Sequence, residues 1–235
     1  FGNPENQEIM GEFAECLEGI KEACNFLNYP VVSGNVSFYN GTNKKNIYPT
    51  PVIGGVGLIK KLSKPISHNF KKTNSTIIVI GKTFGHIEQS CFLKENYSII
   101  DGMPPEINLL NEKNNGESLF KLIDKNLVLS AHDISNGGLI TALSEMTLTT
   151  DFGAKIRKPK SLTNLSKYFF GEDQARYIVE IETKKLPVVE KVLKESNIYY
   201  ENIGFTQANY FEIEGELKIS TKDLFKINNQ WYKNY

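Results

Sequence analysis

The sequence predicts an α/β protein made of two domains. From about residue 76 onward, short aliphatic and β-branched runs alternate with segments whose apolar residues recur every three or four positions, as buried strands and amphipathic helices require. Between Lys60 and Lys72, five lysines and a proline interrupt this pattern, which suits a solvated linker better than a phosphate site. Because 235 residues suffice for two small domains, we place a boundary near residue 68 and expect domains at 1–68 and 69–235.

Charge and composition favour a small-molecule ligand. Lys and Arg together number 27, as do Asp and Glu, so the net charge is zero and neither nucleic acid nor an anionic membrane is expected as a partner. No apolar run reaches the length of a membrane span, and no signal peptide is expected. Cys16, Cys24 and Cys91 form no CxxC pair and indicate reduced thiols in the cytoplasm.

The first domain is expected to begin with a helix. Asn3 suits the N-cap and Pro4 the first helical position, and an apolar stripe that should face a sheet follows at Ile9, Phe13, Leu17, Ile20, Cys24 and Leu27. Two buried strands are expected after this helix. One contains Val31 and Val32, and the other runs from Val52 to Ile59.

The second domain alternates strands and helices. We expect strands at 76–81, 127–130, 177–182, 199–206 and 210–214, and helices at 116–124, 139–146 and 187–195. This order predicts a single sheet covered by helices on one side.

The first candidate site is the segment from Ser33 to Ser37, where the predicted strand runs into flexible polar residues. Gly34 lacks a Cβ, so its backbone can adopt a positive φ or approach a ligand closely. The Asn35 amide and the Ser37 hydroxyl are two residues apart and would face the same side of an extended chain. The segment suits a phosphate or a metal ion, but it also suits an ordinary glycine turn with local backbone hydrogen bonds.

A second candidate site lies where His132 and Asp133 precede the glycine pair 137–138. The N–H groups at a helix start favour an anion, and Asp133 could hold the magnesium that accompanies a nucleotide phosphate. The structural alternative is that Ser135 or Asn136 caps the helix, the glycines permit close packing and His132 is a core histidine. The residues alone leave both interpretations open.

Charged residues concentrate in a third segment, from Gly171 to Arg176. Glu172 and Gln174 would share one face of an extended chain, where they suit hydrogen bonds to a substrate. Arg176 would be available to bind a carboxylate or phosphate. An Arg–carboxylate pair that fixes a turn is at least as good an interpretation. No Ser-His-Asp set, HExxH motif or Walker A motif occurs in the sequence.

Five motifs in order resemble one known family over essentially the whole chain: Phe1 to Glu5, Val31 to Ser37, Pro49 to Gly54, Ala131 to Leu139, and Gly171 to Gln174. Together they closely resemble the C-terminal half of phosphoribosylformylglycinamidine synthase. The resemblance implies an α/β (α+β) fold that is aminoimidazole-ribonucleotide-synthetase-like (PurM-like). Residues 1–68 would be the end of an N-terminal domain and 69–235 a C-terminal domain.

The same resemblance implies an ATP-dependent carbon–nitrogen ligase of purine biosynthesis. In the family, ATP phosphorylates the amide oxygen of formylglycinamide ribonucleotide, and ammonia then displaces phosphate to give the amidine. Phosphate leaves far more readily than an amide oxygen, and Mg²⁺ stabilises the charge that develops during transfer. Ammonia comes from a separate glutaminase subunit, which forms a complex with a small accessory subunit.

The resemblance implies a binding role for three residues of the second motif. Gly34 matches a position that contacts ATP, Asn35 one that ligates magnesium, and Ser37 one that binds the ribonucleotide. No catalytic residue is assigned to this chain, because the family's catalytic histidine and most of its magnesium ligands lie in the first half.

The second and third candidate sites match the family differently. His132, Asp133 and the segment Glu172 to Arg176 are counterparts of residues that bind substrate and metal in the first half. Since the two halves are not equivalent, we treat these residues as a candidate auxiliary nucleotide site.

The sequence departs from the family pattern after Asn40. Gly41 stands where the family usually has glutamate and Lys44 where it has glycine. We expect the 235 residues alone to be inactive as a ligase, because the catalytic half and an aspartate that the family carries just before Phe1 are absent from them.

Three hypotheses of different classes follow. The chain is half of the ligase, or a non-catalytic nucleotide-binding module, or a relative on the same fold such as a selenophosphate synthetase or a thiamine-monophosphate kinase. The motifs around Gly34 and Gly171 fit the purine enzyme better than the third class.

Overall fold

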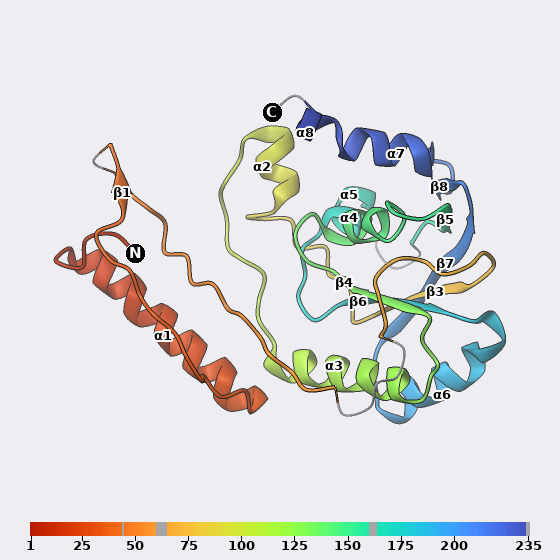
Figure 1. The fold of residues 1–235 in the computed structure, drawn as a ribbon, viewed down its shortest axis with the longest axis horizontal. Helices are drawn as coiled ribbons and strands as arrows, with labels where there is room; N and C mark the ends of the chain where they lie inside the picture. Colours follow the sequence, from red (N-terminus) through yellow and green to blue (C-terminus); the bar gives the residue numbers. More distant parts are fainter. Residues whose placement is uncertain (44, 60–64, 160–163, 234–235) are drawn as a thin grey trace. The chain divides into compact units, whose positions relative to one another are not determined.

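The computed structural model describes residues 1–43, 45–59, 65–159 and 164–233, in which the chain forms two compact units, Phe1–Ser63 and Lys64–Tyr235 (Figure 1). Lys44 and the lysines at 60, 61 and 64, which the sequence predictions name, lie outside these residues. The domain boundary near residue 68 stays a prediction.

The first unit contains helix α1 (Gln7–Leu27) and an antiparallel pair of two-residue strands, β1 (Gly41–Thr42) and β2 (Lys45–Asn46). The predicted helix start was wrong. Asn6 is the N-cap of α1, because its side chain accepts a hydrogen bond from the Glu8 N–H at 2.9 Å. Asn3 instead closes the preceding turn by accepting from the Glu5 N–H at 2.9 Å.

The two buried strands predicted in the first unit were also wrong. The segments around Val31 and Val52 are extended but form no strand, and their apolar side chains are exposed, with Val32 at 90% and Val56 at 92%. A strand is stable only when a neighbour pairs its N–H and C=O groups. None of the described residues pairs with these two segments.

Among its described residues, the second unit contains seven strands in the order β4-β6-β3-β7-β5-β8-β9, and all neighbours are antiparallel except β5 and β8. The strands are β3 (Thr76–Ile80), β4 (Ser130–Asp133), β5 (Phe152–Ile156), β6 (Tyr177–Ile181), β7 (Tyr200–Ala208), β8 (Tyr210–Ile213) and β9 (Leu217–Ser220). The helices are α2 (Cys91–Tyr97), α3 (Leu109–Asp124), α4 (Gly138–Glu145), α5 (Leu165–Phe170), α6 (Leu186–Glu195), α7 (Thr221–Asn228) and α8 (Gln230–Lys233), with a 3-10 turn at Thr183–Lys185. The predicted α/β class is confirmed.

Helices cover both faces of this sheet, so the prediction of a single covered face was wrong (Figure 1). All of β3 is buried, and its side chains alternate between two hydrophobic clusters. Ile77 and Val79 belong to the cluster that includes residues of α4 and α5. Ile78 and Ile80 belong to the cluster that includes residues of α3 and α6.

One strand lies three residues beyond its predicted position. Leu127 and Val128 are buried as an apolar run should be, but the Leu127 N–H bonds back to the Leu122 carbonyl at 3.0 Å and closes the end of α3. The strand therefore starts at Ser130. His132 and Asp133 consequently lie within β4, paired with residues of β6.

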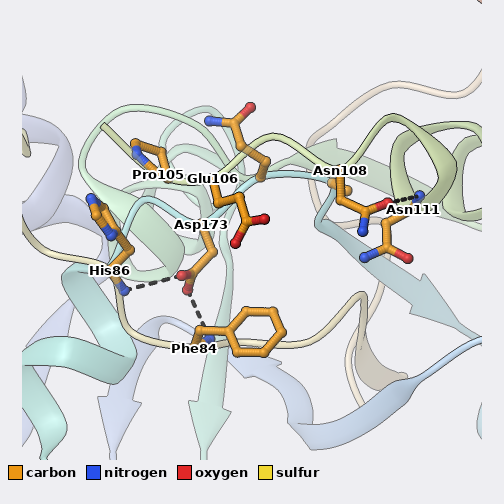
Figure 2. Close-up of a pocket in the computed structure, with 9 residues that line it drawn as sticks. Phe84, His86, Pro105, Glu106, Asn108, Asn111 and Asp173 are labelled. Atoms are coloured by element: carbon orange, nitrogen blue, oxygen red, sulfur yellow. Dashed lines mark hydrogen bonds between the residues drawn. The ribbon is translucent and has the colours of Figure 1, made fainter. Parts of the chain in front are cut away.

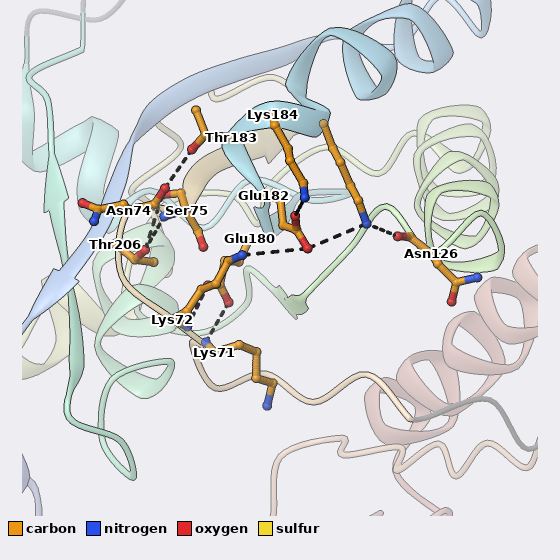
Figure 3. Close-up of polar contacts among 11 residues, drawn as sticks. Lys71, Lys72, Asn74, Ser75, Asn126, Glu180, Glu182, Thr183, Lys184 and Thr206 are labelled. Carbon is orange, nitrogen blue, oxygen red and sulfur yellow. Dashed lines mark hydrogen bonds and ion pairs between the residues drawn. The ribbon is translucent and has the colours of Figure 1, made fainter.

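The buried carboxylate of Glu180 on β6 binds the segment that precedes β3 to the sheet (Figure 3). Glu180 is fully buried and accepts hydrogen bonds from the Lys71 N–H at 2.9 Å, the Lys72 N–H at 3.3 Å and the Ser130 hydroxyl at 2.8 Å. Glu182, two residues on, instead pairs near the surface with lysine side chains. The two glutamates therefore have the same chemistry in opposite environments.

Within the described parts of the chain, no helix is long and apolar enough to cross a membrane.

We expect Glu180→Ala to lower the free energy of unfolding by about 3 kcal/mol, because three donors lose a charged acceptor inside the protein. Urea unfolding followed by circular dichroism measures this. Glu182→Ala is the matched control and should leave stability nearly unchanged, since its ion pairs are solvated. Equal effects of the two substitutions would contradict the structural role of Glu180.

Candidate functional site

Gly34, Asn35 and Ser37 lie together on an exposed extended segment of the first unit. The segment is fixed at its end by Phe38, whose ring centroid lies 5.1 Å from that of Phe13 on α1. The Tyr39 N–H then donates to the Gly2 carbonyl at 2.8 Å. The predicted strand is absent, but the three residues remain on one accessible stretch.

This segment leaves its polar groups open. A Cβ built on Gly34 would meet no heavy atom within 4 Å, so a ligand can approach the backbone there. Ser37 uses its carbonyl to accept from the Phe1 nitrogen at 2.9 Å, and both its hydroxyl and the Asn35 amide are exposed. Neutral oxygens of this kind fit a magnesium–nucleotide site, but residues 33–40 include no carboxylate.

The loop from Gly171 to Arg176, between α5 and β6, uses its carboxylates to bind backbone groups. Asp173 is buried and accepts from the N–H groups of residues 84, 85 and 86 at 3.0, 2.9 and 3.0 Å. Glu172 accepts from the Cys91 N–H at 2.8 Å and the Gly137 N–H at 2.7 Å. Both acids therefore hold other segments in place, and the hypothesis that Glu172 forms hydrogen bonds to a substrate stays a prediction.

The buried Arg176 side chain binds carbonyl groups of the same loop. It is 1% exposed and donates to the Gly171 carbonyl at 2.6 Å, the Asp173 carbonyl at 3.1 Å and the Thr83 hydroxyl at 3.2 Å. Burial lowers the pKa of its guanidinium, while the Asp173 carboxylate, 3.8 Å away, acts in the opposite direction. The interpretation of an Arg–carboxylate pair that fixes a turn is confirmed.

The His132 ring contacts two carboxylates, that of its neighbour Asp133 and that of Glu145 on α4. His132 Nδ1 lies 3.1 Å from the Asp133 carboxylate, and Nε2 lies 3.0 Å from the Glu145 carboxylate. Among the residues that the structure describes, no group of three or more His, Cys, Asp or Glu is arranged to hold a metal ion.

The glycine pair at the start of α4 serves close packing. Gly138 has φ 72°, and a Cβ there would lie 2.7 Å from the Gly171 carbonyl oxygen. The N-cap Gly137 has no side-chain cap, and its N–H meets the Glu172 carboxylate. The anion predicted at this helix start is thus a carboxylate of the protein itself.

A pocket of about 360 Å³ opens beside the 171–176 loop (Figure 2). It is lined by residues from three segments, 84–86, 105–111 and 173–175. Sequence reasoning singled out the 171–176 segment, which contributes residues 173–175, but missed the lining residues at 84–86 and 105–111. Asn108, a residue type that favours the N-cap, was the sequence signal that could have placed the start of α3 correctly. Its side chain accepts a hydrogen bond from the Asn111 N–H at 3.0 Å, and α3 begins seven residues before the predicted start at 116.

Comparison with known families matches both units. Residues 72–213 match the family described as AIR synthase related protein, C-terminal domain, and residues 1–59 match AIR synthase related protein, N-terminal domain.

Two relatives match over the whole chain. The phosphoribosylformylglycinamidine synthase subunit PurL of Pelagibacter ubique is 48% identical over 235 residues, and that of Rhodopseudomonas palustris is 40% identical over 235 residues. This chain spans 32% of the length of each.

Solved structures share the fold. The Thermotoga maritima PurL complexed with FGAR has a TM-score of 0.56 and 15% identity, covering 68% of this chain and 29% of that one. The same protein complexed with ATP has a TM-score of 0.53 and 13% identity, over 68% and 27%. The structure of PurLQS from the same organism has a TM-score of 0.54 and 16% identity, over 68% and 27%.

We expect Asp173→Asn to lower the free energy of unfolding by about 2 kcal/mol, because the amide replaces one acceptor oxygen by a donor that faces backbone N–H groups. Denaturant unfolding checks this, with Asp124→Asn at the exposed end of α3 as the matched control. An Asp173→Asn protein as stable as the control would show that the loop does not depend on this carboxylate.

Proposed function

The chain belongs to the family of AIR synthase related proteins, and from this membership we propose that it forms the C-terminal part of a phosphoribosylformylglycinamidine synthase. Identity of 48% over all 235 residues to one such subunit is the observation that carries the proposal. The enzyme is an ATP-dependent carbon–nitrogen ligase of purine biosynthesis, and its place is the cytoplasm. Its substrates are formylglycinamide ribonucleotide, ATP and ammonia.

The exposed segment of the first unit contributes to the ATP and substrate site. Gly34 lets the backbone approach the nucleotide, because no side chain or neighbouring atom fills the space beside it. The Asn35 side-chain oxygen would ligate Mg²⁺, and the Ser37 hydroxyl would form a hydrogen bond to the ribonucleotide. When bound, Mg²⁺ neutralises charge on the phosphoryl group during its transfer to the amide oxygen.

This segment is one wall of a composite site. Mg²⁺ prefers six oxygen ligands, usually with one or two carboxylates, whereas residues 33–40 offer two amides and hydroxyls. The remaining ligands and the catalytic histidine must come from other parts of the complete enzyme. The proposal therefore assigns Gly34, Asn35 and Ser37 to binding and no residue of this chain to catalysis.

Ammonia is supplied by partner subunits. A glutaminase subunit releases it from glutamine, and a small accessory subunit joins the complex. The solved PurLQS assembly of a relative on the same fold supports such a complex.

In the complete enzyme, we expect Asn35→Ala to raise the Mg²⁺ concentration at half-maximal rate by about tenfold, because one oxygen ligand is lost. Ser37→Ala should raise the KM for formylglycinamide ribonucleotide by about tenfold through a lost hydrogen bond. Ammonia-dependent ADP formation measures both.

Asn25→Ala and Thr42→Ala are the matched controls, since both residues are exposed in the same unit and lie outside residues 33–40. If the site variants behave like these controls, the assigned roles are wrong. If no variant or parent forms ADP with formylglycinamide ribonucleotide and ammonia, the ligase assignment itself is wrong.

A further inference from the structure

We propose that Phe38 is a positioning residue, whose ring, held against α1, directs the side chains of Asn35 and Ser37 toward their ligands. The proposal rests on the proposed function, in which these two side chains bind magnesium and the ribonucleotide. Phe38 acts through them and needs no contact of its own with a ligand.

The segment that carries Asn35 and Ser37 has little support before Phe38. Residues 30–36 form no hydrogen bond with any residue that the structure describes, and all seven are exposed. An extended chain without a paired neighbour keeps the freedom of its backbone dihedral angles. The orientation of this segment therefore depends on how its end is attached at residues 37–40.

The Phe38 ring packs against two other rings. Its centroid lies 5.1 Å from that of Phe13 on α1, with an interplanar angle of 77°, and 6.3 Å from that of Phe1. Phe1 and Phe13 also contact each other, at 5.0 Å and 77°. Edge-to-face pairs of this kind are favourable. Because each ring touches the other two, Phe38 has a defined position against α1.

Hydrogen bonds fix the backbone on both sides of this ring. The Ser37 carbonyl accepts from the Phe1 nitrogen at 2.9 Å, and the Tyr39 N–H donates to the Gly2 carbonyl at 2.8 Å. The Asn40 N–H and the Asn40 side-chain amide both donate to the Phe1 carbonyl at 3.1 Å. Tyr39 has φ 59°, a conformation that costs energy for a residue with a Cβ and persists only where the surroundings determine it.

The side on which Phe38 is held decides the side that Asn35 and Ser37 face. Successive side chains of an extended chain point to opposite sides. With Phe38 packed on α1, Ser37 and Asn35 point away from the helix, and both are exposed. Val36, on the same side as Phe38, is the least exposed valine of this segment, at 46%. Loss of the ring would free the segment to rotate, and the hydroxyl and the amide would no longer share one direction.

Steady-state kinetics of the complete enzyme with ammonia test the proposal. Phe38→Ala should raise both the KM for formylglycinamide ribonucleotide and the Mg²⁺ concentration at half-maximal rate by about tenfold, while kcat changes less than about twofold. Phe38→Leu keeps an apolar anchor and should stay within about threefold of the parent. The matched control is Ile20→Ala, which removes a half-buried side chain about two turns further along α1 and should leave both constants unchanged.

A double variant shows whether Phe38 acts through Ser37. Adding Phe38→Ala to Ser37→Ala should raise the KM for the ribonucleotide by less than about twofold, because the group to be positioned is already absent. Multiplied effects, parental constants in Phe38→Ala, or equal changes in Phe38→Ala and Ile20→Ala would overturn the proposal. An active parent enzyme would leave the ligase assignment intact in each of these cases.

Hydrogen exchange of the full chain tests the attachment without any activity. The Tyr39 and Asn40 amides donate to the Gly2 and Phe1 carbonyls, so they should exchange at least about tenfold faster in Phe38→Ala and at the parental rate in Phe38→Leu. Unchanged exchange in Phe38→Ala would overturn the positioning role even if the ligase assignment were wrong.

Discussion

The structure of the second unit depends on the loop from Gly171 to Arg176, whose charged side chains must all be paired inside the protein. Its two carboxylates accept hydrogen bonds from five backbone N–H groups, at residues 84–86, at the start of α2 and at the N-cap of α4. Arg176, buried beneath the loop, satisfies two of its carbonyls and reaches Thr83. A buried ion that loses its partners costs free energy of folding. We therefore expect the loop, the 83–86 segment and both helix starts to lose their structure together.

This constraint separates structural charge from ligand-binding chemistry. Charged and glycine-rich motifs that suggest anion binding in the sequence are occupied by the protein's own groups, with Glu172 at α4 and Asp133 against His132. Some groups left open are of another kind: the Gly34 backbone with the Asn35 and Ser37 side chains in the first unit, and the Phe84 ring in the second.

The central elements of the second unit were predictable, since β3, β6 and α6 have strong local periodicity, whereas α2, α5, α7, α8 and β9 were not predicted. Strand β5 was missed because Phe152 to Ile156 includes a glycine and a lysine, and its pairing is set by distant β7 and β8. Gly153 is required there, as a Cβ would collide with the Tyr210 backbone.

In the first unit, local signals at Val31 and Val52 predicted strands that lack partners among the described residues. Residue chemistry singled out Gly34, Asn35 and Ser37 together but left an ordinary turn open, and the family resemblance implied a role for each. The pocket, by contrast, depends on contacts between segments far apart in sequence.

Hydrogen exchange of the full chain carrying Arg176→Lys tests the central role of the 171–176 loop most directly. Lysine keeps the charge but cannot reproduce the planar set of donors that Arg176 supplies. The account predicts faster exchange at residues 84–86, Cys91 and Gly137 together, while β3 stays protected. Unchanged exchange at these positions, or a change confined to residues next to 176, would contradict it.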